Sequence, residues 1–246
     1  MSGEETSSFT TNPRGLQFDE EYQWGGDDGE PWTDAIAESN GVTVSDTGGV
    51  TSDSRFTDYF EGTSLDTSKW TAYGTDHGNI TVSDGTLTIE QTEGPESNEN
   101  IIGVYATERF SVGSVLTVRS RNSAGRHAGI IGVADAEGRA FSHGTAEYGG
   151  PGANLYGRAD DVTGSCSARD ENGDTYSPDP SVQDFREFRE LRIERPDENT
   201  VEFYIDGSLD TTISMPFAGD YNPYFAADGH TVPNRIEVDF VEVKRA

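Results

Sequence analysis

Three carboxylates follow one another closely near the C-terminal end of the sequence, at Glu237, Asp239 and Glu242. Two carboxyl groups about 5–5.5 Å apart can cleave a glycosidic bond with retention of configuration. On a regular strand Glu237 and Asp239 share a face while Glu242 points the other way, so the three converge only if the strand contains a bulge. The three carboxylates can therefore act together on a glycosidic bond only if the local strand geometry brings them to one face of the sheet.

A second candidate site is the glycine-rich stretch 141–158, which has the sequence FSHGTAEYGGPGANLYGR. Flat aromatic faces together with amide and guanidinium donors suit a sugar ring, which has an apolar face and a rim of hydroxyl groups. The glycines predict a long loop, and functional residues concentrate on long loops. The alternative is a surface loop whose aromatic residues shield the core. The candidate glycan-binding residues are His143, Tyr148, Asn154, Tyr156 and Arg158.

The stretch 170–174 (DENGD) places oxygen ligands at alternate positions around a glycine, as the first half of a calcium-binding loop does. Asp170, Asn172 and Asp174 are thus candidate ligands for a structural calcium ion. The glutamate expected at the twelfth position is missing, because that position is Ser181, so an ordinary acidic turn is favoured. The histidines have no metal-ligand spacing, and we expect no required cofactor apart from high salt.

The elements that must position these residues are short strands. Residues 80–83 and 86–89 flank Asp84-Gly85, and residues 201–205 precede Asp206-Gly207; both dipeptides are typical of tight hairpins. No convincing helical periodicity is present, apart from an ambiguous run at 184–191. The sequence therefore predicts an all-β protein, an antiparallel β-sandwich or jelly roll. The further predicted strands are 101–106, 114–121, 128–134, 188–194, 200–206, 209–214, 222–227 and 235–243.

The first 55 residues have a different composition, rich in Gly, Ser, Thr and acidic residues with isolated aromatic residues. Such a segment cannot build its own core. We therefore expect residues 1–55 to form an extended acidic arm for attachment or assembly, and residues 56–246 to form the sandwich domain.

The charge of the chain is strongly negative, with 45 acidic and 17 basic residues and a formal net charge of -28. At ordinary ionic strength the charges of such a surface repel one another. The Debye length, over which salt screens these charges, falls to about 3 Å only near 1 M salt. Only two of the basic residues are lysines, Lys69 and Lys244, and this depletion fits a salt-adapted surface. The composition predicts a halophilic protein; an acidic protein from an ordinary environment is the alternative.

The same charge excludes several classes of partner. A negative field repels phosphate backbones and anionic lipid, so we expect no nucleic-acid binding and no membrane insertion. No stretch approaches the ~20 apolar residues of a membrane span, and no secretory signal is visible. The single cysteine, Cys166, cannot form an internal disulfide, and we expect it in a loop without redox function.

Three stretches resemble the concanavalin A-like lectin/glucanase superfamily. Residues 56–70 (FTDYFEGTSLDTSKW) resemble its opening strand and LDxxxW turn, residues 202–207 (EFYIDG) its late strand pair, and residues 236–243 (IEVDFVEV) its closing strand. The resemblance covers residues 56–246 and implies a jelly roll. The superfamily includes family 16 glycoside hydrolases, laminin-G-like domains and legume-type lectins, so the fold alone does not choose the function.

The resemblance also bears on the three carboxylates. In the family 16 signature E-x-D-x-x-E, Glu237 would be the nucleophile, Asp239 an electrostatic helper and Glu242 the acid/base. That signature lies in the middle of those domains, whereas here it falls in the expected last strand, and the middle of this sequence contains no second copy. We therefore expect residues 237–242 to be structural and the protein not to be an enzyme.

These expectations together favour a non-catalytic binding module displayed outside a halophilic cell or particle. The interpretation that best fits the missing signal is a virion spike, turret or tail-fibre component of an archaeal virus. We expect it to bind a host-surface glycan or glycoprotein, to contact other assembly proteins through residues 1–55, and to form a homo-oligomer. The alternatives are a secreted family 16-like glycan hydrolase and a processed cell-surface carbohydrate-binding protein.

Overall fold

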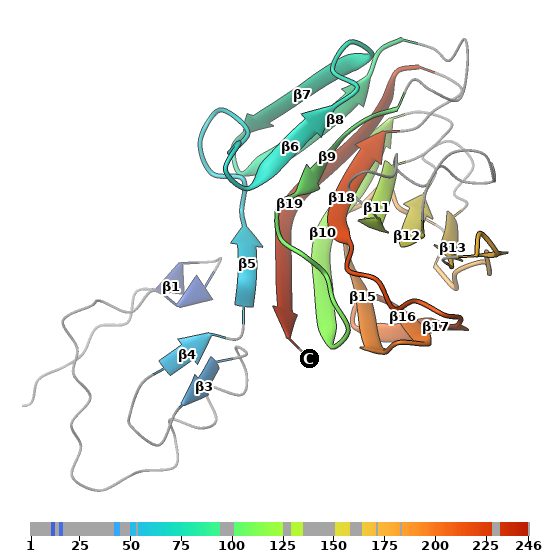
Figure 1. The fold of residues 1–246 in the computed structure, drawn as a ribbon. Coiled ribbons are helices and arrows are strands. Elements are labelled where there is room, and N and C mark those ends of the chain that lie inside the picture. The colour runs from blue at the N-terminus through green and yellow to red at the C-terminus, as the bar shows by residue number, and fades with distance from the viewer. Residues whose placement is uncertain are drawn as a thin grey trace, which may run out of the picture. The chain divides into compact units, whose positions relative to one another are not determined.

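The structure is a computed structural model of the whole chain (Figure 1). It divides into two units, residues 1–52 and 53–246. The residues that it describes are 11–12, 15–16, 42–44, 50–52, 54–93, 101–124, 129–134, 151–157, 164–170, 172–182, 184–227 and 232–245.

The first unit contains two short antiparallel pairs among its described residues. β1 (Thr11–Asn12) pairs with β2 (Gly15–Leu16), and β3 (Val42–Val44) pairs with β4 (Val50–Ser52). Strands of two or three residues bury little apolar surface, so neither pair supplies a core of its own.

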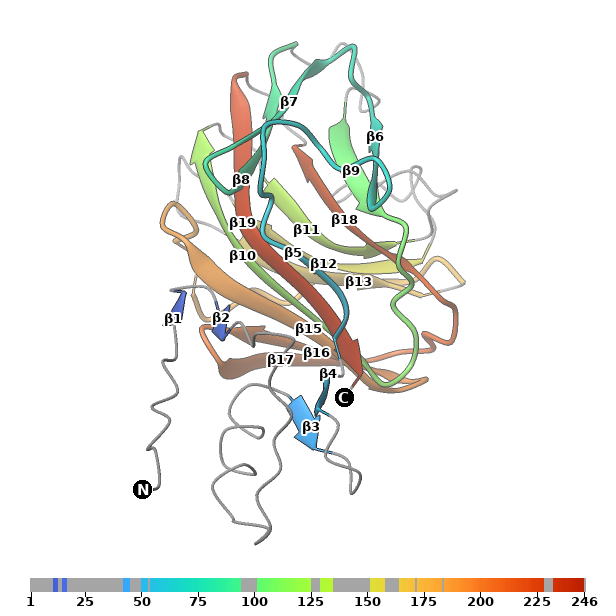
Figure 2. The same ribbon diagram turned by 90° about the vertical axis from the view of Figure 1, so that its left-hand side faces the viewer.

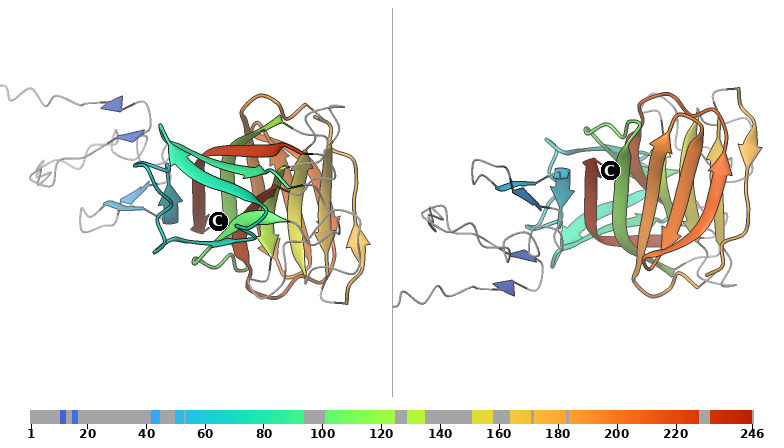
Figure 3. Two further views of the ribbon diagram at one scale, coloured as in Figure 1. Left: turned by 90° about the horizontal axis from the view of Figure 1, so that it is seen from above. Right: turned by 90° about the horizontal axis from the view of Figure 1, so that it is seen from below.

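The second unit is a sandwich of two antiparallel sheets, seen as two layers in Figure 3. We name each sheet after one of its strands. The β19 sheet has the order β17-β16-β15-β10-β19-β8-β7, with β5 also paired to β19. Its strands are β5 (Ser54–Asp58), β7 (Gly78–Ser83), β8 (Thr86–Gln91), β10 (Ser114–Ala124), β15 (Arg189–Asp197), β16 (Thr200–Ile205), β17 (Ser208–Ser214) and β19 (Asn234–Arg245).

The second layer, the β12 sheet, has the order β14-β13-β12-β11-β18-β9-β6. Figure 2 shows the long strand β19 running across the other layer beside β10. The strands of the β12 sheet are β6 (Trp70–Tyr73), β9 (Ile102–Ala106), β11 (Gly129–Ala134), β12 (Gly152–Gly157), β13 (Gly164–Arg169), β14 (Thr175–Tyr176) and β18 (Asn222–Ala227).

The core lies between the sheets because side chains alternate along each strand. In β8 and β16 every second residue is buried, as period-2 patterning requires. Trp70 joins the two layers: its ring centroid lies 5.3 Å from that of Phe56 on β5 and 5.2 Å from that of Phe225 on β18. This arrangement confirms the predicted all-β sandwich.

Both predicted hairpins are present. Asp84 and Gly85 join β7 to β8 with φ of 51° and 73°, and Asp206 and Gly207 join β16 to β17 with φ of 50° and 78°. Positive φ at both central positions is the type I′ geometry that Asp-Gly adopts readily. The local sequence therefore sets the register of these strand pairs.

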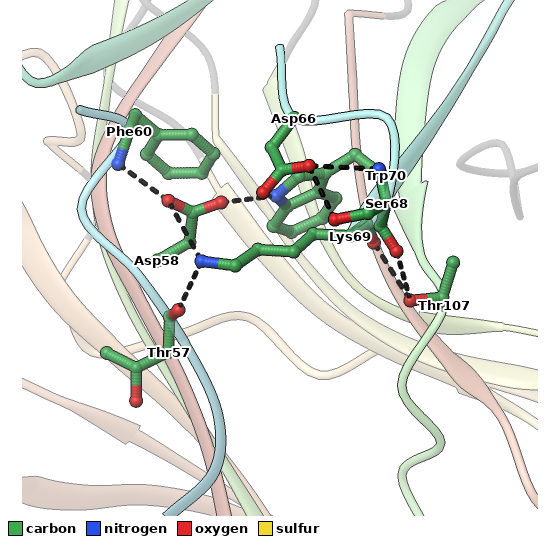
Figure 4. Close-up of polar contacts among 8 residues, drawn as sticks. All are labelled: Thr57, Asp58, Phe60, Asp66, Ser68, Lys69, Trp70 and Thr107. Carbon is green, nitrogen blue, oxygen red and sulfur yellow. Dashed lines mark hydrogen bonds and ion pairs between the residues drawn. The ribbon is translucent and has the colours of Figure 1, made fainter. Parts of the chain in front are cut away.

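The LDxxxW turn is held by a network of carboxylates (Figure 4). Asp66 accepts hydrogen bonds from the Ser68 hydroxyl at 2.6 Å and from the Ser68 backbone N–H at 2.9 Å. Those bonds hold the pKa of Asp66 below its usual value. Lys69 donates to the carbonyl of Thr57 at 3.0 Å, which ties the turn to β5.

Two local expectations were wrong. The stretch 152–157 is a strand rather than part of a loop, and Cys166 is buried in β13 rather than lying in a loop. The run at 184–191, ambiguous in the sequence, forms no helix: irregular chain there leads into β15, which overlaps the strand predicted at 188–194. Both missed strands are rich in Gly, Ser and Ala, whose weak intrinsic β propensity is overridden by packing. Within the described ranges, no helix is long and apolar enough to cross a bilayer.

Candidate functional site

The outer face of the β12 sheet carries a polar residue at its centre. On β12, Ala153 and Leu155 point into the core between the sheets. Asn154 between them therefore points to the opposite face, where its amide Nδ2 donates to the hydroxyl of Tyr224 at 3.3 Å. Asn154 is 1% exposed, so this central amide is buried.

The strand register places Asn154 in a row of residues that crosses the sheet. Asn154 pairs with Gly132 on β11, Gly132 pairs with Tyr224 on β18, and Tyr224 pairs with Tyr105 on β9. On the other side Asn154 pairs with Ser167 on β13. We call the outward side chains Tyr105, Tyr224, Asn154 and Ser167 the central row.

A second row, two residues along, is mostly small and apolar. Tyr73 pairs with Gly103, which pairs with Ala226, and Ala226 pairs with Ile130. A Cβ at Gly103 would lie 2.5 Å from the hydroxyl oxygen of Tyr73, so glycine allows that ring to lie across the strand. Tyr73 stacks on Tyr105 with ring centroids 6.2 Å apart, which gives the face an aromatic end.

The opposite end of the central row is rich in hydroxyl groups. The Ser167 hydroxyl lies 3.2 Å from that of Ser165 and 3.0 Å from that of Ser177, and either oxygen of each pair can donate. Among the described outward residues of this sheet, Arg169 is the only charged one. Neutral amide and hydroxyl groups beside aromatic rings can bind a sugar, but they provide no acid for hydrolysis.

The predicted glycan-binding residues fall only partly in the described chain. Asn154 lies in the central row, and the backbone of Tyr156 pairs with Ile130 and Ser165 in the second row. His143, Tyr148 and Arg158 lie outside the described residues. The involvement of all five residues stays a prediction.

The carboxylates at Glu237, Asp239 and Glu242 lie on the other layer, on β19. The register with β10 shifts there, because Arg119 pairs with Phe240 and Ser120 pairs with Val238. Val238 and Val241 are both in the core, three positions apart, so this irregularity brings all three carboxylates to the outer face of the β19 sheet. The bulge that their convergence requires is therefore present.

Basic side chains engage these carboxylates. Arg121 Nε donates to Glu237 Oε2 at 2.6 Å, Arg119 donates to Asp239, and Lys244 Nζ lies 3.8 Å from Glu242 Oε2. The guanidinium carbons of Arg119 and Arg121 lie 5.0 and 4.7 Å from the ring centroid of Phe188. The two arginine contacts are cross-strand ion pairs between β10 and β19, and the lysine contact lies within β19. Together they stabilise the sheet without singling out one carboxyl group as a proton donor.

The calcium candidate residues form a turn instead of an open ligand set. The carboxylate of Asp170 accepts the backbone N–H groups of Asn172 and Asp174, both at 2.9 Å. Burial favours the neutral acid, but these hydrogen bonds outweigh it and hold the pKa of Asp170 below its usual value. Within the described residues no group of three or more His, Cys, Asp or Glu side chains could hold a metal ion. Of the four histidines, only His77 lies in that part of the chain.

The sandwich is similar to several solved structures. β-Agarase B from Zobellia galactanivorans is 14% identical, with a TM-score of 0.58 over 77% of this chain and 91% of that one. An endo-acting O-glycanase of the human gut microbiota is 17% identical, with a TM-score of 0.56 over 78% and 99%. A β-1,3-1,4-glucanase from a mouse hindgut metagenome is 14% identical, with a TM-score of 0.57 over 78% and 99%. No family model and no curated protein matches the sequence.

The sandwich has the concanavalin A-like jelly-roll fold. The superfamily resemblance seen in residues 56–70, 202–207 and 236–243 is thus confirmed at the level of the fold. The expectation that the protein is not an enzyme is contradicted, because these neighbours are glycan-cleaving enzymes. That expectation relied on the absence of one carboxylate signature from the middle of the sequence, which is too narrow a test for a fold that hosts many active sites.

Most of the central row of the β12 sheet could not be identified from the sequence. Tyr105, Tyr224 and Ser167 come from three strands that are distant in sequence, and no local motif connects them to Asn154. Only the order of the strands and their register bring them together. Residues 222–227 (NPYFAA) are all buried and show no alternation of apolar and polar side chains, so the direction of Tyr224 could not be predicted from their pattern.

Proposed function

We propose that this protein is a glycan hydrolase that holds its substrate against the outer face of the β12 sheet. The fold supports the proposal, since glycan-cleaving enzymes share it. The observation that carries it is the central row, in which Tyr105, Tyr224 and Asn154 lie side by side across the middle of the sheet. Aromatic faces and an amide match the apolar face and hydroxyl rim of a sugar.

Hydrolysis also requires a pair of acidic side chains, and the described outward residues of the β12 sheet include none. The connection from β11 to β12 lies outside the described residues, and its sequence contains Asp135, Glu137 and Glu147. We assign the acid pair to this connection, because it joins the two strands that carry Gly132 and Asn154 at the centre of the row. The β19 carboxylates Glu237 and Glu242 are the competing pair.

The test is a hydrolysis assay on a panel of glycans. Purified protein is incubated with soluble β-1,3-glucan, mixed-linkage β-glucan, agarose and mucin O-glycans, and the released reducing ends are measured. Two of the three variants Asp135→Asn, Glu137→Gln and Glu147→Gln should each lower the rate by about 10²- to 10⁴-fold without changing the circular dichroism spectrum. Glu237→Gln is the matched control and should leave the rate unchanged.

Two results would overturn this assignment. If wild-type protein releases no product from any probe, at low or high salt, the hydrolase proposal is wrong. If Glu237→Gln or Glu242→Gln abolishes hydrolysis in a folded protein, catalysis belongs to the outer face of the β19 sheet and not to the β12 sheet.

The partners and location predicted from sequence are part of the same proposal. A hydrolase that acts on host-surface glycans can be secreted, held at a cell surface or carried on a virion by an acidic arm at residues 1–55. The neighbours cleave glycans, which favours the hydrolase over a purely structural virion component. A mass-spectrometric inventory of purified particles and of the culture medium separates these locations, and light scattering tests the homo-oligomer.

A further inference from the structure

Strand β7 contains the one N-glycosylation pattern in the amino-acid sequence. Residues 79–81 are Asn-Ile-Thr, and no other asparagine of the chain is followed two positions later by serine or threonine. This N-x-S/T pattern is the acceptor for N-linked oligosaccharides when it lies at the surface of a protein. A pattern this short also arises by chance, so its place in the fold must show whether it can carry a sugar.

Asn79 and Thr81 share one exposed face of β7. Both side chains are exposed, whereas Val82 is buried in the core and Ile80 packs against the core. Alternate residues of a strand point to the same side, so the asparagine amide and the threonine hydroxyl both point away from the core. Both groups of the acceptor pattern are therefore accessible, and a sugar on Asn79 would displace no buried side chain.

β7 is also an edge strand without the usual protection against pairing with another chain. It ends the β19 sheet, and β8 is its only partner among the described strands (Figure 1). None of the residues Gly78–Ser83 (GNITVS) is charged or a proline. At the other sheet ends β17 carries Asp210, and β6 and β14 are shorter. Because natural edge strands are protected by charge, proline, short length or a covering group, β7 is the edge that a bulky oligosaccharide would protect.

We propose that Asn79 is the attachment site of an N-linked oligosaccharide. The donor is an oligosaccharide linked through phosphate to a polyprenol lipid, and the cell supplies it together with the transferase. Asn79 Nδ2 forms a bond to the anomeric carbon of the sugar and releases one proton, while the bond from that carbon to the phosphate oxygen breaks. The site lies on the outer face of the β19 sheet, so it is separate from the proposed substrate face on the β12 sheet.

The test is mass spectrometry of the protein isolated from the cells that naturally produce it. Trypsin cleaves after Lys69 and Arg109 and releases peptide 70–109. This peptide should be heavier than its sequence by the mass of an oligosaccharide, and fragmentation should place the added mass on Asn79. Protein made in a bacterial host that lacks the transferase should have the mass of its sequence. An unmodified peptide from the natural cells would overturn the proposal.

Substitutions in the same cells test the acceptor pattern itself. Asn79→Gln and Thr81→Ala should each abolish the modification, the second although the acceptor amide remains. Thr81→Ser should keep the modification because it retains the hydroxyl. Asn199→Gln is the matched control, since Asn199 is exposed but lies outside the pattern, and it should leave the modification unchanged. A sugar that persists on peptide 70–109 of Thr81→Ala would overturn the assignment.

A second copy of the chain is the competing occupant of this edge. If peptide 70–109 is unmodified and light scattering shows a dimer that Thr81→Lys dissociates, β7 joins two copies of the chain and the proposal is wrong. Attachment at Asn79 requires no catalytic residue of this protein. A wild type that carries the sugar but hydrolyses no glycan would therefore overturn the proposed function and support this inference.

Discussion

The carboxylate of Asp58 accepts the indole N–H of Trp70 at 2.7 Å, so the side chain that joins the two layers is anchored by a buried acid. The same carboxylate accepts the backbone N–H of Phe60 at 2.9 Å and lies 3.8 Å from Lys69 Nζ (Figure 4). Three groups of the opening segment therefore depend on one side chain.

Asp58→Ala should lower the free energy of unfolding by about 2–4 kcal/mol, because it leaves the buried N–H groups of Trp70 and Phe60 without acceptors. Denaturant titration followed by tryptophan fluorescence measures the change. Glu61→Gln, at an exposed neighbouring position, is the control and should stay within about 0.5 kcal/mol of the wild type. Equal stability of the two variants would show that the network does not hold the turn.

The LDxxxW network and both hairpins are features that local sequence determines, which is why they were predictable. Asp-Gly requires particular backbone angles, and alternation in residues 86–91 and 200–205 marks one buried face. β12 and β13 were missed because Gly152, Ala153 and Ser165 have weak intrinsic β propensity. Their strands are stabilised by neighbours that come from elsewhere in the chain.

The candidate site was predictable only in part, for the same physical reason. Asn154 stood out within a glycine-rich stretch, but its partner Tyr224 lies on a strand that follows much later in the sequence. The bulge near Asp239 lies where β19 pairs with Arg119 and Ser120 of β10. It could not be predicted from the sequence of β19 alone, because it arises in the pairing of two strands. The pattern along one strand indicates which side chains face the core. It does not indicate which residues of other strands lie beside them, because that register is set by the whole fold.

A second prediction concerns Arg195, which is fully buried. Its guanidinium donates to the carbonyls of Phe110, Gly219 and Phe217 and lies 4.8 Å from the Phe217 ring centroid. Arg195→Met should destabilise the fold by about 3–5 kcal/mol, because the carbonyls of Gly219 and Phe217 lose the guanidinium donor and that of Phe110 keeps only the backbone N–H of Tyr221. Calorimetric unfolding measures the change in stability, and Arg186→Met at an exposed position is the control. A loss of stability no larger than that of the control would contradict the prediction.

A third prediction concerns the thiol of Cys166. Burial, with the nearby Asp210 carboxylate 3.7 Å from the sulfur, raises the pKa of this thiol far above its usual value. The thiolate is the reactive form, so the native protein should not react with a thiol reagent such as DTNB at pH 8 over hours, whereas one thiol should react at once in guanidinium chloride. Rapid labelling of the native protein would place Cys166 at the surface.

A fourth prediction concerns the stability of the protein at acid pH. The Arg186 side chain donates to both oxygens of Asp184, at 2.9 and 2.6 Å, and holds the pKa of Asp184 at about 2. A lowered pKa contributes stability that is fully present above the unfolded value near 4 and is lost as pH falls through about 2. The melting temperature should therefore fall between pH 4 and pH 2, and slightly less steeply in Asp184→Asn, since this pair is partly exposed. A steeper fall of the melting temperature in Asp184→Asn would contradict the stabilising role given to the ionised Asp184.

The last prediction is that salt holds this protein together. With a net charge of -28, self-repulsion grows as screening weakens, and the Debye length lengthens from about 3 Å at 1 M salt to about 10 Å at 0.1 M. Dialysis from 2 M to 0.1 M KCl should therefore lower the melting temperature of the folded sandwich sharply. Because the effect is one of summed charge, its size should depend on the number of exposed acids rather than on any one ion pair.

A variant with fewer charges tests that cause directly. Glu61→Gln, Asp84→Asn, Asp179→Asn and Glu187→Gln together remove four exposed acidic charges, and Asn tolerates the positive φ at position 84. The combined variant should melt higher than the wild type in 0.1 M KCl and close to it in 2 M KCl, because screening already removes the repulsion there. A melting temperature that is independent of salt in the wild type would remove the halophilic interpretation. If the four substitutions leave the salt dependence of the melting temperature unchanged, the dependence comes from the effect of salt on apolar burial and not from charge repulsion.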